Sequence, residues 1–579
     1  MFNKLPVSWR HKVAQLIRTP VALQFMRAAR HPRAYQEKQL NTLLRANQHT
    51  AFGRQYGFQD IDNFDTYREK VPLMSPETLR PWVEKMQAGQ TNMLTAEEPV
   101  FYGKSTGTTG TPKEIPINNT YRKDFQRSVF VSAWFYYRNV PEAFSHKLLY
   151  FVAQRCLSRT PNGLEVGYIS GYNFTELPEQ IRSIYAWPYE IVEVEDLESR
   201  LYLSLHIAIM EKVSLIAGIF PSNILLMFRA LRRYADEMAT HFEAGTLPEW
   251  LKLTDEQKAF FEAYKTKSPA LAQRMKQVDK APELEKVALA LPYLRVIFCW
   301  KTSTAGMYIP ELQERVGPHV KLRDTIYSAT EGWCSIPLGE EEDGGPVALT
   351  SHVYEFIEEE IVDEHGADLE ALSQVRTKLV DELEVSKRYY IILTTSAGLY
   401  RYFLGDLVEV SGFWRTLPKL QFVRKYGATY NLVGERLEET NVNIAIGQAL
   451  QNVARRATWF AMVPTFDSTP YYQLFVEFTD EAISEEALQH FADEVHTQLE
   501  ENTLYWEEFI HEGVLKRLKV RQVKTGSMAK QFARWESEGR SVGQLKLSHL
   551  VTDTEKLPCR PEEDIVCEVL AALIEEPQP

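Results

Sequence analysis

Residues 101–116 read Phe101-Tyr102-Gly103-Lys104-Ser105-Thr106-Gly107-Thr108-Thr109-Gly110-Thr111-Pro112-Lys113-Glu114-Ile115-Pro116. An apolar, strand-like start runs into a loop of hydroxyls and glycines, and an apolar segment follows Lys113. Glycine permits the positive-φ conformations in which successive N–H groups point inward as an anion nest, and Ser and Thr donate further hydrogen bonds. Lysine adds a mobile positive charge. The loop therefore suits an oligophosphate.

Other interpretations of this loop compete with an oligophosphate site. A Walker A loop is excluded, because its lysine follows a glycine and precedes Ser or Thr at the start of a helix, whereas Lys113 follows a proline and precedes a glutamate. Residues 103–107 match the G-x-S-x-G elbow, which would make Ser105 a hydrolase nucleophile. That elbow must run into a helix, and residues 108–116 are β-branched, contain glycine and are twice interrupted by proline. A purely structural Gly/Thr turn also remains possible.

Length and composition narrow the class of protein. The chain has 579 residues, of which 44% are hydrophobic and 25% charged; this predicts a globular protein with several domains' worth of residues. The net charge of −13 argues against a nucleic-acid partner, which needs a concentrated basic face. No run of residues is long and apolar enough to span a bilayer. We expect a cytoplasmic protein with reduced thiols, because the five cysteines are scattered without zinc spacing: Cys156, Cys299, Cys334, Cys559 and Cys567.

The first 36 residues contain no Asp or Glu. Basic residues alternate there with apolar ones such as Trp9, Leu16, Ile17 and Leu23. We predict an amphipathic helix that packs on the body of the protein, since helical apolar spacing usually reflects core contact. An organelle transit peptide or a helix on a membrane surface would have a similar composition, so membrane contact is a less favoured alternative.

Four buried strand-like segments alternate with helical stretches: residues 147–153, 213–220, 294–300 and 322–327. Such alternation predicts a mostly parallel sheet, with ligands at the ends of the strands. Residues 235–290 are charged and helical, and we expect a helical hairpin on the outside. The fold class is therefore α/β.

After residue 345 the pattern changes to β-rich segments separated by turns: residues 347–362, 389–395, 399–410 and 420–432. These predict a distorted β-barrel or a second sheet. From residue 441 onward we expect a helix, a hairpin-like pair (457–466 and 471–478), a helix over 484–509 and a strand over 518–523. This order predicts a compact α+β lobe.

Two further groups of candidate binding residues follow predicted β segments. Tyr327-Ser328-Ala329-Thr330-Glu331-Gly332 closes a predicted strand, so Tyr327 could stack on a base and Glu331 could hold Mg²⁺ against phosphates. Asp406 stands just past a glycine, where a carboxylate can accept both ribose hydroxyls; a plain Gly-Asp turn is the alternative. Arg424 could contact ribose or phosphate, or be a surface cation.

These stretches occur in the order that resembles the adenylate-forming superfamily of acyl-CoA synthetases, peptide-synthetase adenylation domains and luciferases. Within it, the chain resembles the Gretchen Hagen family of acyl acid amido synthetases, and we expect a non-plant member. The likeness extends from about residue 35 to 550. It rests on residues 39–44 with Thr50-Ala51-Phe52-Gly53, on residues 105–113, on residues 327–332, on residues 397–406 and on Gly543-Gln544-Leu545-Lys546.

The resemblance implies a role for each matching residue. ATP phosphates would be held by Ser105, Thr106, Gly107, Thr108, Thr109 and Gly110. Tyr327 and Thr330 would contact adenine and phosphate, Glu331 would serve Mg²⁺, and Asp406, with Arg424 nearby, would bind ribose. Lys546 would be the mobile catalytic lysine. Two positions depart from the family: Lys104 replaces the usual Ser, and Leu547-Ser548 replaces the Pro-Arg that follows the lysine.

The implied reaction joins a small carboxylic acid to an amine. The acid attacks the α-phosphate of ATP, pyrophosphate leaves, and an amine, expected to be that of an amino acid, displaces AMP. The alternatives are an acyl-CoA ligase or another acyl transfer through an adenylate, and a catalytically degenerate binding or scaffold protein.

The resemblance also implies an architecture. We expect a large N-terminal domain (1–424) of parallel sheets plus the barrel, a hinge (425–440) and a small mobile α+β domain (441–579), which is the adenylate-forming fold. Residues that should face the acyl pocket are Arg122, Phe220, Ser222, Thr304 and Tyr308. Arg122 could pair with the acid, or with a neighbour in an exposed helical ion pair.

Overall fold

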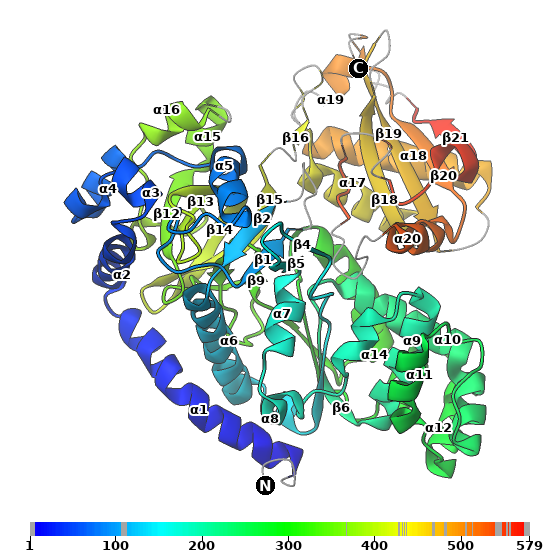
Figure 1. The fold of residues 1–579 in the computed structure, drawn as a ribbon. Coiled ribbons are helices and arrows are strands. Elements are labelled where there is room, and N and C mark those ends of the chain that lie inside the picture. The colour runs from blue at the N-terminus through cyan, green and yellow to red at the C-terminus, as the bar shows by residue number, and fades with distance from the viewer. Residues whose placement is uncertain are drawn as a thin grey trace. The chain divides into compact units, whose positions relative to one another are not determined.

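The computed structural model (Figure 1) describes the chain apart from short segments. The described residues are 6–105, 113–365, 368–426, 429–430, 432, 435, 437–465, 469–479, 483–503, 506–511, 513, 515–538, 547–551, 554 and 557–572. The chain divides into two compact units, Met1–Val423 and Arg424–Pro579. Each unit is described by itself.

The expected parallel sheet lies in the first unit. Its four strands run in the order β3-β6-β7-β8, every neighbouring pair is parallel, and the bounds are β3 Lys147–Tyr150, β6 Val213–Ala217, β7 Val296–Cys299 and β8 Lys321–Asp324. Crossover helices between parallel strands bury both faces of such a sheet. The predicted alternation is confirmed, but each strand ends before the residue predicted. In β8 the reason is local: the Asp324 carboxylate accepts the N–H groups of Thr325 and Gly344, which turns the chain away.

Helices accompany this sheet and the elements beside it. They are α7 Ile169–Thr175, α8 Glu179–Arg182, α9 Leu197–Met210, α10 Pro221–Ala244, α11 Asp255–Phe261, α12 Pro269–Lys280, α13 Lys286–Ala290 and α14 Ile309–Val316. The expected outer hairpin is present, since α10 packs on α12, and Figure 1 shows α9 to α12 grouped together at one side of this unit. Apolar side chains of α9, α10, α12 and the strands form one core.

A second, mixed sheet has the order β2-β1-β5-β4, with β4 Ser158–Arg159 and β5 Glu165–Gly167. Strands β1 Phe101–Lys104 and β2 Glu114–Ile117 are antiparallel, with Lys104 opposite Glu114. The loop predicted to hold phosphate therefore joins two paired strands and not a strand and a helix. Pairing of the strand before Ser105 with the strand that begins at Glu114 differs from the nucleophile elbow, in which the serine leads from a strand into a helix.

The β-rich region forms a five-stranded sheet in the order β11-β15-β14-β13-β12. Its strands are β11 Gly345–Pro346, β12 Val353–Glu358, β13 Arg388–Thr394, β14 Tyr402–Trp414 and β15 Leu417–Lys425. The short strands β9 Tyr327–Ser328 and β10 Trp333–Ser335 form a separate two-stranded sheet. The strand predicted over 347–362 is wrong at both ends: β12 begins only at Val353 after a turn, and α15 Glu359–His365 follows it, with α16 Leu369–Ser373 after that. Strand β14 begins later than predicted because Arg401 has a positive φ of 43°.

The N-terminal segment is helical: α1 Val7–Ala28, α2 Pro32–Asn47, α3 Ala51–Gln55, α4 Phe64–Lys70 and α5 Pro76–Gln87, with α6 Asn119–Asn139 after the β1-β2 hairpin. Helix α1 packs against α6, as predicted: Gln15 donates to the Trp134 carbonyl, and the Trp134 indole donates to Thr19. A second core unites these helices with β1, β2 and β12 to β15. No helix in the described part of the chain is long and apolar enough to cross a membrane.

The second unit contains the predicted hairpin, β18 Ala457–Thr465 and β19 Tyr471–Phe478, in a sheet of order β18-β19-β20-β21. Its other elements are β16 Thr429–Tyr430, β17 Leu437–Glu438, α17 Glu439–Asn452, α18 Glu485–Asn502, α19 Trp506–His511, β20 Lys519–Val523, α20 Ser527–Ser537, α21 Pro561–Asp564 and β21 Ile565–Leu570. The single helix predicted over 484–509 is wrong, because Thr503 takes an extended conformation and ends α18. Strand β21 was not predicted.

Candidate nucleotide and acyl site

The neck of the predicted phosphate loop is closed by two hydrogen bonds. Ser105 N–H donates to the Lys113 carbonyl at 2.9 Å, and Lys113 N–H donates to Ser105 Oγ at 3.0 Å. Thr106, Gly107, Thr108, Thr109 and Gly110 lie outside the described residues. The Ser105 hydroxyl therefore holds the ends of the loop together, which fixes where the loop leaves and rejoins the sheet.

The Tyr327–Gly332 segment lies directly against this hairpin. Thr330 Oγ1 is 3.5 Å from the Lys104 carbonyl, and the Tyr121 hydroxyl donates to the Thr330 carbonyl at 2.9 Å. At Gly103 an added Cβ would lie 2.8 Å from Thr330 Cγ2, closer than two carbon atoms can pack. Glycine at this position lets two of the predicted motifs come together.

The third motif joins at Asp406. The Tyr327 hydroxyl donates to Asp406 Oδ2 at 2.7 Å, and both residues are buried. Burial and the neighbouring Asp406 carboxylate raise the pKa of Tyr327 well above its usual value, so the phenol stays protonated and remains a donor. The structure thus brings Ser105, Tyr327, Thr330 and Asp406 into one region, although they are far apart in sequence.

A cation, a phenol and a carboxylate meet beside them. Lys113 Nζ lies 3.3 Å from the Tyr402 hydroxyl and 3.5 Å from Glu331 Oε1, and the Tyr402 hydroxyl donates to Glu331 at 3.3 Å. Burial raises the pKa of Tyr402 well above its usual value, and the Glu331 carboxylate adds to this. Tyr402 did not appear among the predicted site residues. Its place at the end of the Leu399–Tyr402 run was the available signal.

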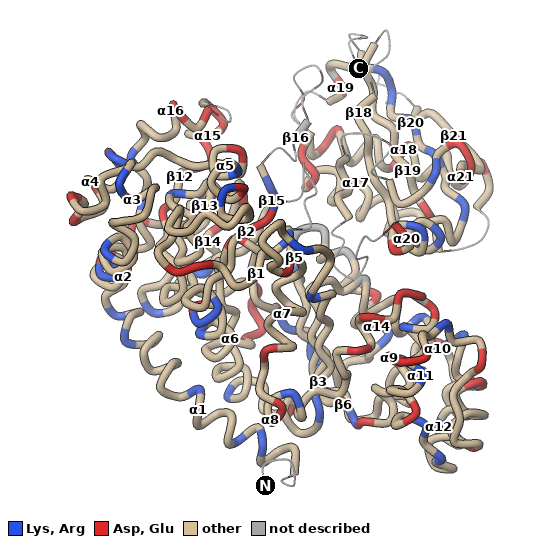
Figure 2. Tube along the Cα trace, in the orientation of Figure 1, with Lys and Arg blue, Asp and Glu red and all other residues tan. Residues whose placement is uncertain are grey.

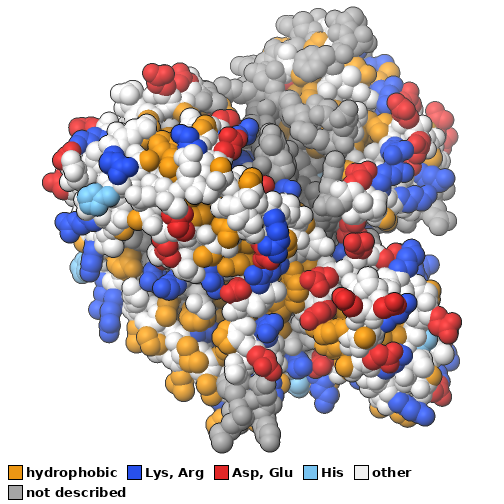
Figure 3. All heavy atoms as spheres, viewed as in Figure 1, with side chains coloured by type: hydrophobic (Ala, Val, Ile, Leu, Met, Phe, Trp, Pro, Cys, Tyr) orange, Lys and Arg blue, Asp and Glu red, His pale blue; other side chains and the backbone are white. Residues whose placement is uncertain are grey.

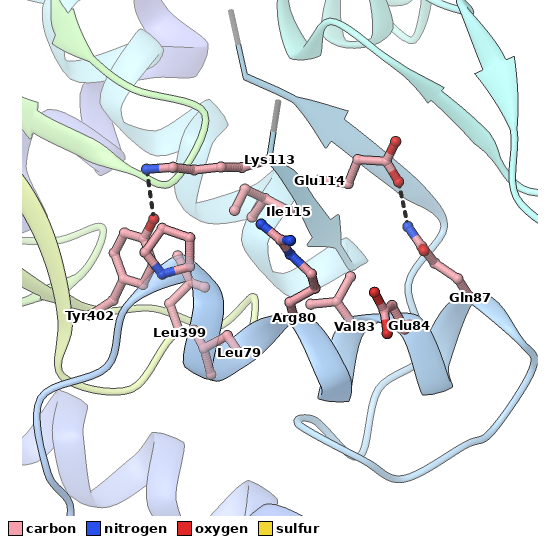
Figure 4. A pocket seen from close by; sticks show the side chains of 11 residues that line it. Leu79, Arg80, Val83, Glu84, Gln87, Lys113, Glu114, Ile115, Leu399 and Tyr402 are labelled. Atoms are coloured by element: carbon pink, nitrogen blue, oxygen red, sulfur yellow. Dashed lines mark hydrogen bonds between the residues drawn. The ribbon is translucent and has the colours of Figure 1, made fainter. Parts of the chain in front are cut away.

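A cavity of about 270 Å³ opens beside Lys113, between α5, β2 and the start of β14. Figure 4 shows Lys113 extended toward Tyr402 at one end and Glu114 bonded to Gln87 at the other. Its wall is apolar at Leu79, Val83, Ile115 and Leu399 and charged at Arg80, Glu84, Lys113 and Glu114. The cavity places solvent-accessible space next to the Lys113–Tyr402–Glu331 contacts.

The residues predicted for the acyl pocket come from two places: Arg122 from α6, and the others from the segments that follow β6 and β7. Arg122, in the first turn of α6, forms an ion pair with Glu176 at 3.3 Å and lies over the Tyr172 ring. Phe220, the residue before α10, packs edge-to-face on Trp300 at 5.3 Å. Burial raises the pKa of Tyr308 to about 12, and the side chains of Ser222 and Thr304 lie outside the described residues.

Trp300 was not among the predicted site residues. It connects Phe220 to the segment that contains Tyr327–Gly332. Its indole N–H donates to the carbonyl of Ile326 at 3.0 Å. Ile326 precedes Tyr327, so this bond ties the ends of β7 and β8 to the Tyr327–Gly332 segment. An aromatic residue at the end of a predicted strand was the signal for Trp300.

Two predicted residues belong to the second unit. Arg424 Nε lies 3.2 Å from Glu438 Oε2, and Arg424 is buried. Lys546, with Gly543, Gln544 and Leu545, lies outside the described residues. The second unit therefore provides one described candidate, whose charge is matched by a glutamate.

Three family models match successive parts of the chain. They are the GH3 family N-terminal domain over residues 22–322, the GH3 family central domain over residues 345–425 and the GH3 family C-terminal domain over residues 440–555. The chain belongs to the GH3 family. The resemblance to the Gretchen Hagen (GH3) family is thereby confirmed.

Two named relatives and a solved structure are similar to the chain over most of its length. The chain is 23% identical to the indole-3-acetic acid-amido synthetase GH3.3 of Arabidopsis thaliana, covering 90% of this chain and 89% of that protein. It is 23% identical to the jasmonoyl–L-amino acid synthetase JAR4 of Nicotiana attenuata, covering 90% and 91%. The solved structure of the GH3.15 acyl acid amido synthetase matches with a TM-score of 0.82 at 20% identity, over 95% of this chain and 97% of that one. The α/β fold of this GH3 chain is that of the solved amido synthetase.

Proposed function

We propose that this chain is an ATP-dependent acyl acid amido synthetase. It would activate a small carboxylic acid as its adenylate, release pyrophosphate, and transfer the acyl group to the amine of an amino acid with release of AMP. Membership of the GH3 family supports this activity, since the similar proteins bear the names of amido and amino acid synthetases. The observation that carries the proposal is the convergence of the three predicted nucleotide motifs at Ser105, Thr330 and Asp406.

Each of the three predicted motifs would then contact a different part of ATP. The backbone N–H groups and hydroxyls of residues 105–110 would receive the phosphates, in keeping with the closed neck at Ser105. Tyr327 would face adenine, Thr330 phosphate and Asp406 ribose, with Arg424 as a second contact. The bond from Tyr327 supports the role of Asp406, because it fixes the orientation of the carboxylate, and carboxylate oxygens accept hydrogen bonds such as those from ribose hydroxyls.

We propose magnesium as the metal cofactor, held by Glu331 together with the phosphates of ATP. Among the described residues no group of three His, Cys, Asp or Glu side chains could hold a metal. Mg²⁺, however, usually takes one or two carboxylates together with substrate phosphates. The buried Glu331 carboxylate provides such an oxygen donor, and bound Mg²⁺ would neutralise charge on the phosphates.

Lys113 would supply positive charge near the phosphates, and Tyr402 would position it. Lys113 holds a positive charge beside Glu331 and at the mouth of the phosphate loop. Positive charge fixed in place before the reaction stabilises the negative charge that develops when the acid attacks the α-phosphate. Tyr402 is buried and neutral, and it positions Lys113 through a hydrogen bond. We propose Glu331 and Lys546 as the catalytic residues, Lys546 acting in the second half-reaction.

The acid would lie between α6 and the carboxyl ends of the parallel strands. Phe220 and Tyr308, with Ser222 and Thr304 from the same loops, would contact its body, and the Phe220–Trp300 edge offers an aromatic wall. Arg122 would have to leave Glu176 to meet the carboxylate. Both side chains are about one-third exposed, at 28% and 33%, and exposed ion pairs of this kind contribute little stability, so exchange of one carboxylate for another costs little.

We further propose that the β11–β15 sheet belongs to a distorted barrel, that residues 425–440 act as a hinge between a large domain (1–424) and a small one (441–579), and that the small domain moves between the two half-reactions. The change of chain pattern near residue 425 supports the hinge. Movement of the small domain would let one active site serve two different reactions.

The experiment is an ATP–pyrophosphate exchange assay across a panel of carboxylic acids, with Mg²⁺ present. Acids that support exchange are then offered amino acids or CoA, and the products are identified by mass spectrometry. An amide product supports the proposal. A thioester product would favour an acyl-CoA ligase. Folded protein that is silent with every acid would favour a binding or scaffold protein.

A further inference from the structure

Helix α1 packs on the first unit through a face that carries few large apolar side chains. The buried residues on that face are His11, Ala14, Arg18, Ala22, Phe25 and Ala28. Burial lowers the pKa of His11 to about 4 and also lowers that of Arg18. Four of the six buried positions are therefore alanine or histidine, and only Phe25 is a large apolar side chain.

The outward face of α1 carries the large apolar side chains instead. Trp9 is 56% exposed, Leu16 73%, Ile17 57% and Leu23 41%. Trp9, Leu16 and Leu23 are spaced by seven residues, so they lie on one face of the helix. The remaining large apolar side chains exposed in the described part of the chain belong to other elements of the first unit (Trp250, Leu284, Val385 and Phe413) or to the second unit (Ile444, Val566 and Leu570). Clustered exposure of this kind marks an interaction surface.

The charges on this face are all of one sign. Lys12, Arg27 and Arg30 are exposed, Lys12 lies over the Trp9 ring at 4.9 Å, and residues 1–36 contain no Asp or Glu. Figure 2 shows blue but no red along α1. The whole chain, by contrast, has a net charge of −13. A basic strip on an acidic protein fits an anionic partner.

The turn between β14 and β15 extends this surface. Trp414 stacks on Phe25 at 5.6 Å, Arg415 contacts the Met26 sulfur, and Thr416 bonds to the Ala29 carbonyl. Next to these anchors, Phe413 is 43% exposed and Arg415 is exposed. In Figure 3 orange apolar side chains gather along the lower-left edge, where α1 runs in Figure 1.

We propose that the outward face of α1, together with Phe413 and Arg415, docks this protein on an anionic lipid surface. A helix with Trp and Leu on one side and flanking Lys and Arg can lie in the plane of the interface, with apolar side chains among the acyl chains and cations at the headgroups. A second copy fits this face less well, since pairing two such faces would bring like charges together. This docking goes beyond the proposed ligase activity and does not depend on it.

The test is flotation of the full-length protein with vesicles of phosphatidylcholine, with and without phosphatidylglycerol. We expect binding to the anionic vesicles, weakened by salt because of charge screening. The Leu16→Ser, Ile17→Ser double variant should bind at least about tenfold more weakly, since each buried apolar side chain contributes strongly to interfacial affinity. Leu284→Ser, at another exposed apolar position, is the matched control and should bind like the unaltered protein.

Three outcomes would overturn the proposal. The protein could fail to bind phosphatidylglycerol vesicles, or the double variant could bind as well as Leu284→Ser. Alternatively, sedimentation velocity could reveal a dimer that the double variant abolishes, with no vesicle binding by either form, which would assign the face to self-association. The circular dichroism and melting temperature of each variant establish that it is folded.

Discussion

Tyr327 donates its hydroxyl to the carboxylate of Asp406 at 2.7 Å, across 79 residues of sequence. The bond joins the second and third of the predicted nucleotide motifs in the interior of the first unit. Tyr327 is the donor in this bond and Asp406 the acceptor, so Tyr327 orients the carboxylate that would meet the ligand. The two residues can therefore be tested separately.

Asp406→Ala should weaken ATP binding roughly tenfold or more, because a hydrogen bond to a charged group contributes about 1.5–3 kcal/mol. Tyr327→Phe keeps the ring and removes only the bond that orients Asp406, so its effect should be smaller. Calorimetric titration with a non-hydrolysable ATP analogue measures both. Unchanged affinity in Asp406→Ala would remove Asp406 from the ribose site.

Gly103→Ala should lower activity by disturbing the contact between two motifs. The added methyl group would lie 2.8 Å from Thr330 Cγ2, so β1 or the Thr330 segment must shift. Thr330→Ser keeps the hydroxyl and removes that methyl group. We expect the Gly103→Ala, Thr330→Ser double variant to recover much of the kcat/KM for pyrophosphate exchange that Gly103→Ala loses. A double variant as inactive as Gly103→Ala would contradict the steric explanation.

The buried Arg401–Glu355 ion pair should be important for stability. The two side chains are 0% and 1% exposed and lie 3.2 Å apart, and Arg401 also donates to the Val71 carbonyl. Glu355→Ala leaves a buried guanidinium without its carboxylate, which costs about 3–5 kcal/mol. The exposed Lys276–Glu243 pair is the control, and Glu243→Ala should leave the free energy of unfolding nearly unchanged. Chemical denaturation compares the two, and equal effects would be evidence against the burial argument.

Asp324 should make stability depend on pH. Burial raises its pKa to about 6 from an ordinary 3.8, with Lys301 and Asp343 nearby. The folded state therefore binds the proton more tightly than the unfolded chain, and the free energy of unfolding falls as pH rises from about 4 to about 6, then stays level. The loss is roughly 2–3 kcal/mol at about 1.4 kcal/mol per pKa unit.

Urea unfolding of the unaltered protein and of Asp324→Asn, from pH 4 to pH 7, isolates this group. The difference in free energy between the two proteins should shift in favour of Asp324→Asn as pH rises through that window. A difference that is independent of pH would mean that Asp324 does not carry a raised pKa in the folded protein.

The motifs could be predicted from the sequence because their residues are local. A strand end such as Tyr327, or a Gly-Asp pair such as Gly405-Asp406, can be recognised within a few consecutive residues. The order of these motifs along the chain indicated that they share one site. The Trp300–Ile326 and Lys113–Tyr402 bonds were not predicted, since each joins segments brought together only by the fold.

Helix α1 also shows that contacts formed only in the folded chain cannot be predicted from a local stretch of sequence. Its apolar residues predicted a helix that packs on the body, and that is confirmed. Apolar side chains occur on both faces, however, and periodicity alone does not say which face meets α6. Contacts such as Gln15 with Trp134 decide it, and they turn Leu16 outward.

Lys113 and Glu331 lie 3.5 Å apart, and Tyr402 contacts both. If Glu331 serves Mg²⁺, the lysine competes with the metal for the same carboxylate, while its charge also attracts phosphate. Lys113→Met should therefore have two opposite effects: the Mg²⁺ concentration for half-maximal pyrophosphate exchange should fall, and the KM for ATP should rise several-fold. Tyr402→Phe keeps the lysine and should move both values less. A merely structural role for Lys113 would raise both values together, and that result would exclude Glu331 as the magnesium ligand that Lys113 opposes.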